Sequence, residues 1–264
     1  MLLFIVLQVS MFSVLGSLIP ARVTSRTQLL EVDSLLQLVA ALGATAIMLR
    51  SIDIRPWDDV ALARRAARPR SILEGWCLGG AAIGFACGLL LAFGWLRIVP
   101  GPPGSSLATA ASLTLMLVIA ALAEEVIARG YLLTVLRDGL GDWGAIATTS
   151  LLFGAAHLLN AGVTAESFAI VTLAGVFLAA VRVVFRSVYA SWAAHVAWNW
   201  VMAVLFHASV SGIAFDAPDY RMVSTGPEWI TGGAWGPEGG IAAALGMLAA
   251  LAYLYRTRRR REEP

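Results

Sequence analysis

The sequence predicts an all-α, polytopic membrane protein with about eight transmembrane helices and its functional groups inside the bundle. Two observations lead to this fold class. Of the 264 residues, 59% are hydrophobic and only 14% are charged, and the mean hydropathy is +0.77. The apolar residues also gather in long runs, as expected when lipid surrounds most of a chain. These properties exclude an ordinary soluble globular domain.

Eight apolar runs are long enough to be membrane spans, because a bilayer core of about 30 Å requires about 20 residues of helix. We interpret the first run as a span and not as a signal peptide, since it has neither a positively charged start nor a small-x-small cleavage site. The second run is the weakest, because Glu31, Asp33 and Gln37 shorten its apolar part. The expected spans cover residues 2–20, 30–49, 72–96, 106–136, 143–160, 166–186, 188–207 and 239–255.

The arginines predict how these spans are oriented. They cluster in the loop around residues 50–70, at Arg182 and Arg186, and in the tail from Arg256 to Arg261. By the positive-inside rule all three regions are cytoplasmic, and eight alternating spans put them on one side. We therefore expect a multi-pass protein of the cell membrane with both termini in the cytoplasm. The acidic segment 208–238 then lies outside; its charged and interfacial residues are Asp216, Asp219, Glu228, Glu238, Trp229 and Trp235.

Nothing in the composition divides the chain, so residues 1–264 are predicted to form a single integral membrane domain. Because the arginines follow the spans and form no single basic face, the formal net charge of +2 does not indicate a nucleic-acid partner. The expected partners are membrane lipids and a peptide or lipidated-protein substrate. Gly80, Gly84 and Gly88 recur every four residues, which predicts a face for close helix packing.

Two adjacent carboxylates, Glu124 and Glu125, lie inside the fourth expected span. A charge at the bilayer centre costs about 2.5–3.5 kcal/mol on insertion scales, so such groups usually face the bundle interior and serve a function. Glu125 and Arg129 are one helical turn apart in the order that favours an ion pair. Glu124 points about 100° away, so it is the carboxylate expected to remain free for chemistry.

Polar groups on two further spans complete the set. A turn is expected at residues 138–142, and Glu124 and His157 lie about 16 residues on either side of it, so an antiparallel helix pair brings them to similar depth. Phe153 shares a helix face with His157. On the seventh span His195 and Asn199 are one turn apart, and a buried asparagine requires a polar partner.

This set of residues suits peptide hydrolysis. Water is a poor nucleophile, and a buried glutamate is a suitable general base, so Glu124 with His157 is expected to hold and deprotonate a water molecule. The tetrahedral intermediate carries an oxyanion, which Asn199 and His195 could stabilise by donating hydrogen bonds.

The three motifs Glu124-Glu125-x-x-x-Arg129, Phe153-x-x-x-His157 and His195-x-x-x-Asn199 resemble those of the CAAX-protease and bacteriocin-processing (CPBP, Abi) family of intramembrane endopeptidases. The resemblance covers residues 106–205, the expected protease-like core, with no departure at a motif position. It implies that Glu124 is the base, His157 its water-binding partner, His195 and Asn199 the oxyanion site, and Glu125 with Arg129 a structural support. One branch of the family trims prenylated CAAX proteins.

Two alternatives are left open. One glutamate and two histidines could bind zinc with an open fourth position, but no His-Glu-x-x-His motif is present and a metal would consume the base, so we expect no cofactor. The same buried groups could also serve a non-catalytic protein, either a proton-relay transporter or an immunity or assembly factor. No repeats typical of transporters are visible, and no motif residue is lost.

Overall fold

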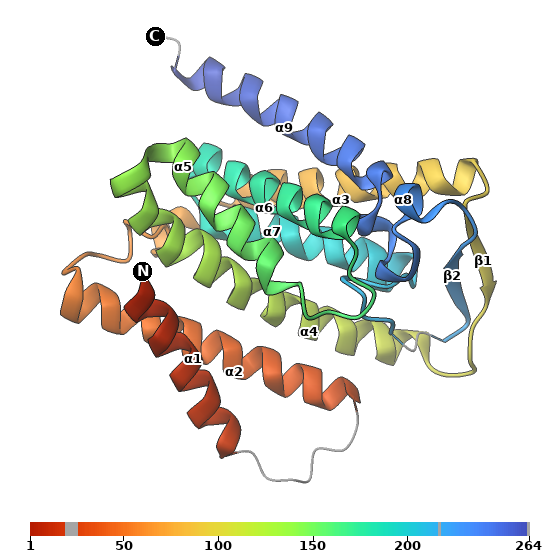
Figure 1. Ribbon diagram of the computed structural model, residues 1–264, viewed down its shortest axis with the longest axis horizontal. Coiled ribbons are helices and arrows are strands. Elements are labelled where there is room, and N and C mark those ends of the chain that lie inside the picture. The colour runs from red at the N-terminus through yellow and green to blue at the C-terminus, as the bar shows by residue number, and fades with distance from the viewer. Residues whose placement is uncertain (19–25, 216–217, 263–264) are drawn as a thin grey trace.

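The computed structural model describes residues 1–18, 26–215 and 218–262 and is predominantly helical (Figure 1). Ile19 and Pro20, which end the first expected span, and Asp216 of the acidic segment lie outside the described residues. Short π-helical segments extend three of the helices, at Met48–Ile52, Val126–Leu132 and Val201–Leu205. The helices are α1 Leu2–Ser17, α2 Arg26–Ile47, α3 Pro69–Ala92, α4 Ser106–Glu125, α5 Leu133–Ala156, α6 Ala165–Phe185, α7 Val188–Trp200, α8 Glu228–Thr231 and α9 Ile241–Glu262.

The all-α, polytopic class is confirmed. Within the described residues, four helical stretches are long and apolar enough to cross a membrane, namely 28–52, 69–92, 106–156 and 165–185. The third stretch joins two expected spans, which are two helices separated by a kink within the expected turn. The chain reverses there at Gly141, whose φ of 67° leaves the helical region. Helix also fills the other expected spans, and the count of eight stays a prediction.

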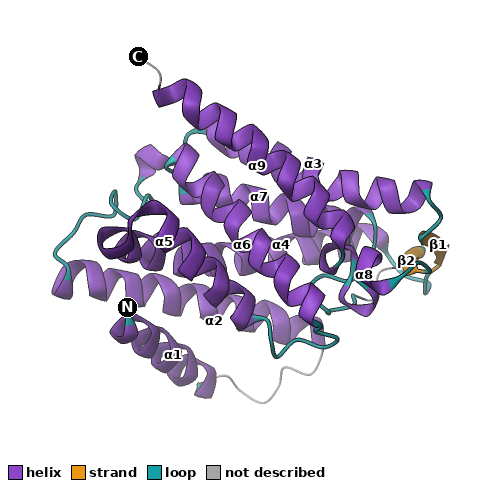
Figure 2. Cartoon of the chain, turned by 45° about the horizontal axis from the view of Figure 1, so that its top comes forward, coloured by secondary structure: helices purple, strands orange, loops and turns teal. Residues whose placement is uncertain are grey.

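The helices pack differently from the antiparallel pair expected for α4 and α5. Helix α5 packs mainly on α6, whereas α4 packs between α2 and α7. Helix α9 covers α3 and α6, as two views of the chain show (Figures 1 and 2). As a result, the polar side chains of α4 lie beside those of α7.

The closest helix contact joins α3 to α7, but not through the glycines expected. A Cβ added at Gly79 would lie 2.7 Å from the Ala194 carbonyl carbon, and one added at Gly75 would lie 3.0 Å from the Ala190 carbonyl carbon. Added Cβ atoms at Gly84 and Gly88 would meet nothing within 4 Å. Of the expected series only Gly80 lies against α7, where an added Cβ would be 3.7 Å from the Ala197 Cβ. The expectation was therefore wrong for Gly84 and Gly88, because the two helix axes approach most closely at Gly75 and Gly79.

The regions expected to be cytoplasmic meet at one end of the bundle. Arg55 Nη1 lies 2.6 Å from Asp138 Oδ2, and this hydrogen bond raises the pKa of Arg55. Arg258 Nη2 lies 3.3 Å from Asp142 Oδ2. The loop after α2, the α5 bend and the C-terminal helix thus share one end. The membrane side that this end faces stays a prediction.

The opposite end holds a small antiparallel sheet that the sequence did not predict. Strand β1, Leu96–Pro100, pairs with β2, Tyr220–Ser224, and the two are short and far apart in sequence. Trp229 is exposed there, but Trp235 and Glu238 of the same segment are only 1% and 7% exposed. Glu238 therefore does not lie in external water as expected, because the chain folds back into the bundle after α8.

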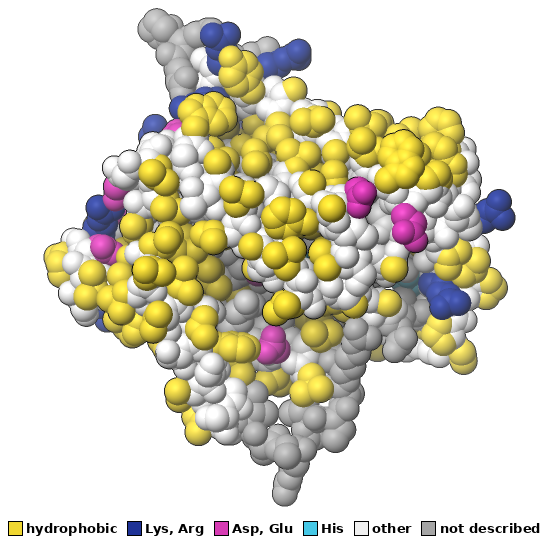
Figure 3. Space-filling model, in the orientation of Figure 1, with side chains coloured by type: hydrophobic (Ala, Val, Ile, Leu, Met, Phe, Trp, Pro, Cys, Tyr) yellow, Lys and Arg dark blue, Asp and Glu magenta, His cyan; other side chains and the backbone are white. Residues whose placement is uncertain are grey.

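The surface agrees with a lipid environment. On the face shown in Figure 3, hydrophobic side chains spread across the helices, and arginine side chains lie toward the edges. Large apolar side chains such as Phe85, Leu115 and Leu151 are more than half exposed. In water such a surface would be unfavourable, so it supports an integral membrane protein.

Candidate active site

Glu125 is the centre of a buried polar cluster at the end of α4. Its side chain is fully buried, and its Oε1 lies 2.8 Å from Arg129 Nη1, so the expected ion pair forms. The same oxygen is 3.1 Å from His195 Nδ1, and the Ser191 hydroxyl donates to the other oxygen, Oε2. Every one of these neighbours is a donor, so Glu125 is held as a carboxylate and is occupied by structural contacts.

Arg129 is placed by the π-helical segment that follows Glu125. Its Nη2 donates to the Gly175 carbonyl oxygen at 3.2 Å, and its guanidinium lies 4.2 Å above the Phe153 ring centre. Phe153 also contacts both histidines, with ring centres 4.8 Å from His157 and 5.9 Å from His195. Phe153 therefore packs the arginine against the two imidazoles, and π-helical segments of this kind are frequent at functional sites.

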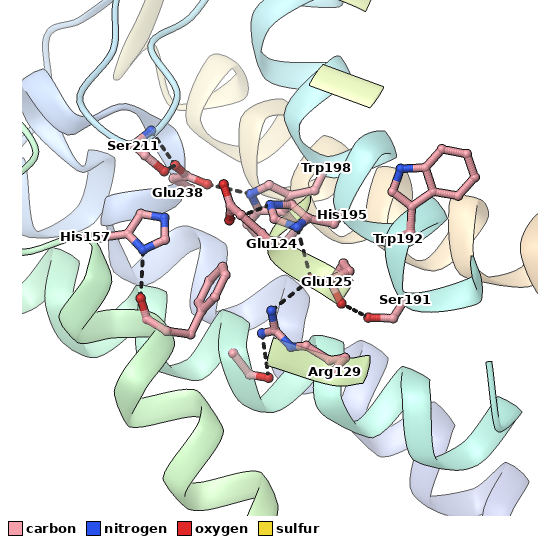
Figure 4. Close-up of polar contacts among 12 residues, drawn as sticks. Glu124, Glu125, Arg129, His157, Ser191, Trp192, His195, Trp198, Ser211 and Glu238 are labelled. Atoms are coloured by element: carbon pink, nitrogen blue, oxygen red, sulfur yellow. Dashed lines mark hydrogen bonds and ion pairs between the residues drawn. The ribbon is translucent and has the colours of Figure 1, made fainter. Parts of the chain in front are cut away.

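His195 connects the two glutamates (Figure 4). Because Glu125 accepts at Nδ1, this nitrogen carries the proton, and the other ring nitrogen, Nε2, lies 4.0 Å from Glu124 Oε2. Glu124 is 31% exposed, yet its Oε2 is buried and has no hydrogen-bond partner among the described residues. Glu124 is thus the carboxylate of the pair that carries no ion pair with an arginine.

His157 ends α5, where its Nδ1 donates to the Phe153 carbonyl oxygen at 2.7 Å. A neutral imidazole held in this way has a lone pair free at Nε2. The meeting of Glu124 with His157 that equal depth suggested stays a prediction. What the sequence did not predict is the approach of Glu124 to His195. The cause is the packing described above, in which α7 and not α5 lies against α4.

A pocket joins three of the candidate residues: His157, His195 and Asn199 all line it. Helix α6 supplies most of its apolar wall, through Val171, Ala174, Phe177 and Leu178. Asn199 is half-buried, so its amide can face a bound molecule. The pocket combines a few polar groups with an apolar wall, which is the usual make-up of a small substrate site.

Sequence reasoning missed several residues of the site, among them Trp198, which lines the pocket. Ser191 and Gly175 form hydrogen bonds with the Glu125–Arg129 pair. Ser211 and Glu238 line the pocket from the segment between α7 and α9. Ser191 is one helical turn before His195, so its position on the same face of α7 was a usable signal. Nothing local indicated Ser211 or Glu238.

The zinc alternative requires three donors gathered around one point. Within residues 1–18, 26–215 and 218–262, no group of three His, Cys, Asp or Glu side chains is arranged to hold a metal ion. Glu124 and His195 approach each other, and the Nδ1 of the other donor considered, His157, is committed to the Phe153 carbonyl oxygen. A metal-independent reaction stays our prediction.

Comparison with known proteins supports the resemblance of the motifs. Residues 106–201 match the family model described as type II CAAX prenyl endopeptidase Rce1-like. The matched segment contains all seven motif residues and ends before Ser211 and Glu238. A comparison with curated proteins gave no match. Residues 106–201 are thus similar to the Rce1-like type II CAAX prenyl endopeptidases, in agreement with the resemblance of the three motifs.

Proposed function

We propose that this protein is an intramembrane endopeptidase that hydrolyses a peptide bond of a membrane-associated protein, with Glu124 as the base that activates water. One observation carries the proposal. Glu124 carries a buried, unpartnered carboxylate oxygen 4.0 Å from His195, whereas the adjacent Glu125 is occupied by Arg129. Two neighbouring glutamates thus have separate environments, as expected when one is structural and the other reactive.

In the proposed reaction Glu124 removes a proton from water, and the resulting hydroxide attacks the carbonyl carbon of the substrate. The carbonyl oxygen becomes an oxyanion, which the Asn199 amide stabilises by donating a hydrogen bond. Protonated His195 can donate a second one from Nε2, since its Nδ1 already donates to Glu125. Glu124 then returns the proton to the leaving amine, so the C–N bond breaks and the carboxylate is restored.

His157 is proposed to orient the water. Its Nδ1 proton is committed to the Phe153 carbonyl oxygen, which leaves Nε2 as an acceptor at the pocket. That lone pair can accept the hydrogen of the water that Glu124 does not remove. Fixing the water in this way lowers the entropy cost of the attack.

The apolar α6 wall suits a hydrophobic side chain or lipid-modified residue of the substrate. A prenylated CAAX-type protein is one such substrate, and a plain membrane peptide is another. We propose that the protein lies in the cell membrane with both termini in the cytoplasm, where its arginine-rich end contacts anionic lipid headgroups, and that the reaction uses no metal.

The test compares the wild type with Glu124→Gln in detergent, on a fluorogenic peptide library that includes farnesylated peptides, with and without a chelator. Glu166→Gln is the matched control, because Glu166 is exposed at the start of α6. We expect cleavage by the wild type and the control, resistance to the chelator, and loss of cleavage in Glu124→Gln.

Each other outcome changes the proposal in a different way. Equal cleavage by wild type and Glu124→Gln would remove Glu124 from the mechanism. Sensitivity to the chelator would favour a metal enzyme. No cleavage of any peptide, with a folded protein, would favour the non-catalytic alternatives, an immunity or assembly factor or a proton-relay transporter.

A further inference from the structure

Ser211 lies in an unfavourable backbone conformation beside the pocket. Its φ of 49° is in the left-handed region, which side-chain-bearing residues adopt only where neighbouring groups compensate. Its backbone N–H and its hydroxyl both donate to Glu238 Oε1, at 2.6 and 2.8 Å. Its carbonyl oxygen accepts from Asn160 Nδ2 at 2.9 Å. Ser211 is therefore held from two sides.

Glu238 is buried and reaches across the pocket to α7. Its second oxygen, Oε2, accepts from the Trp198 indole N–H at 2.8 Å (Figure 4). Within the described residues Glu238 forms no ion pair, so its charge is balanced by three neutral donors from Ser211 and Trp198. A carboxylate is required here, because a glutamine would turn its NH₂ group toward at least one of these donors.

Trp198 links Glu238 to the helix that carries the proposed oxyanion donors. It lies one residue before Asn199 and three after His195 on α7, and it packs on Phe177 of the α6 wall with ring centres 6.4 Å apart. Ser211, Glu238, Trp198 and Asn199 all line the same pocket. The segment that precedes α9 is thereby tied to the helix that carries the oxyanion donors.

We infer that Glu238 is a positioning residue of the proposed protease, acting through Trp198 and Ser211 to set the pocket wall next to Asn199. The inference rests on the proposed function. Glu238 lies outside the three motifs and outside the matched segment 106–201. Its role follows from a buried carboxylate that bonds only to residues of the pocket.

The first experiment measures kcat and KM for Glu238→Gln, with Glu228→Gln as the matched control, since Glu228 is an exposed glutamate on the same segment. The substrates are two peptides that differ in one apolar side chain. We expect kcat/KM to fall roughly 10- to 100-fold in Glu238→Gln, and the ratio between the two peptides to change. A loss of folded enzyme alone would lower both rates by one factor and leave that ratio unchanged.

The second experiment uses Trp198→Phe, which removes the indole N–H and leaves Glu238 and Ser211 in place. If Glu238 acts through Trp198, the double variant is no less active than the worse single variant. Effects that multiply would overturn the link, and so would wild-type kinetics in Glu238→Gln. Trp198→Phe also tests the link if Glu238→Gln does not fold.

Hydrogen exchange distinguishes failure of this inference from failure of the proposed function. Faster exchange of the backbone N–H groups around Ser211 in Glu238→Gln, but not in Glu228→Gln, is expected whether or not a substrate is cleaved. A wild type that cleaves nothing would sink the proposed function and the positioning role with it. An active wild type with unchanged exchange and peptide ratio in Glu238→Gln would overturn the inference alone.

Discussion

Replacing Arg129 by methionine is expected to destabilise the protein strongly. Arg129 and Glu125 are 1% and 0% exposed, and removing one partner of such a buried pair typically costs about 3–5 kcal/mol. His195 and Ser191 still donate to Glu125 in this variant, so we expect a cost at the lower end of this range. The expected loss is about 3 kcal/mol in the free energy of unfolding, or roughly a 100-fold decrease in the ratio of folded to unfolded protein.

The assay is an SDS titration in dodecyl maltoside micelles, followed by circular dichroism. Arg137→Met is the matched control on the same helical stretch, because its pair with Asp142 is 39% and 23% exposed and should contribute under about 1 kcal/mol. The double variant Glu125→Gln/Arg129→Met should lose less than Arg129→Met, since it leaves no unpaired buried charge. A loss below about 1 kcal/mol in Arg129→Met would refute the reasoning.

Three further predictions concern packing, chemistry and orientation. Gly79→Ala should cost about 1–3 kcal/mol by pushing α3 off the α7 backbone, whereas Gly84→Ala, which meets nothing within 4 Å, should be neutral or stabilising in the same titration. Asn199→Ala should lower kcat about 100- to 1000-fold; a drop below about threefold would exclude an oxyanion role. In a variant without native cysteines, an impermeant maleimide should label Thr225→Cys in intact cells and Arg64→Cys only after permeabilisation. The reverse pattern would invert the predicted orientation.

Local sequence spacing predicted the contacts that lie within one helix. Glu125 and Arg129 are one turn apart and form their ion pair, and Phe153 stacks on His157 four residues later. Such pairs depend only on the helical period of 3.6 residues. The hydropathy runs likewise predicted the helices, because burial in lipid requires uninterrupted apolar helix.

Contacts between helices were predicted less well. The approach of Glu124 to His195 was not predicted, because it depends on α4 packing on α7 while α5 packs on α6. The Gly80 series was chosen by spacing, while the actual contact at Gly75 and Gly79 depends on where two helix axes approach. Spacing alone does not determine the point of approach, since several faces of an apolar helix can pack equally well.

The sequence by itself determined that the chain is a helical membrane protein and which polar residues lie within its apolar runs. A charged or amide group in an apolar run is costly, so Glu124, Glu125, His195 and Asn199 are visible without coordinates. Only the tertiary structure decided that His195 binds Glu125 and that Glu238 holds Ser211 and Trp198 at the pocket. These bonds join residues 27 to 70 positions apart, and their partners follow from the packing of helices and loops, which no local pattern of residues encodes.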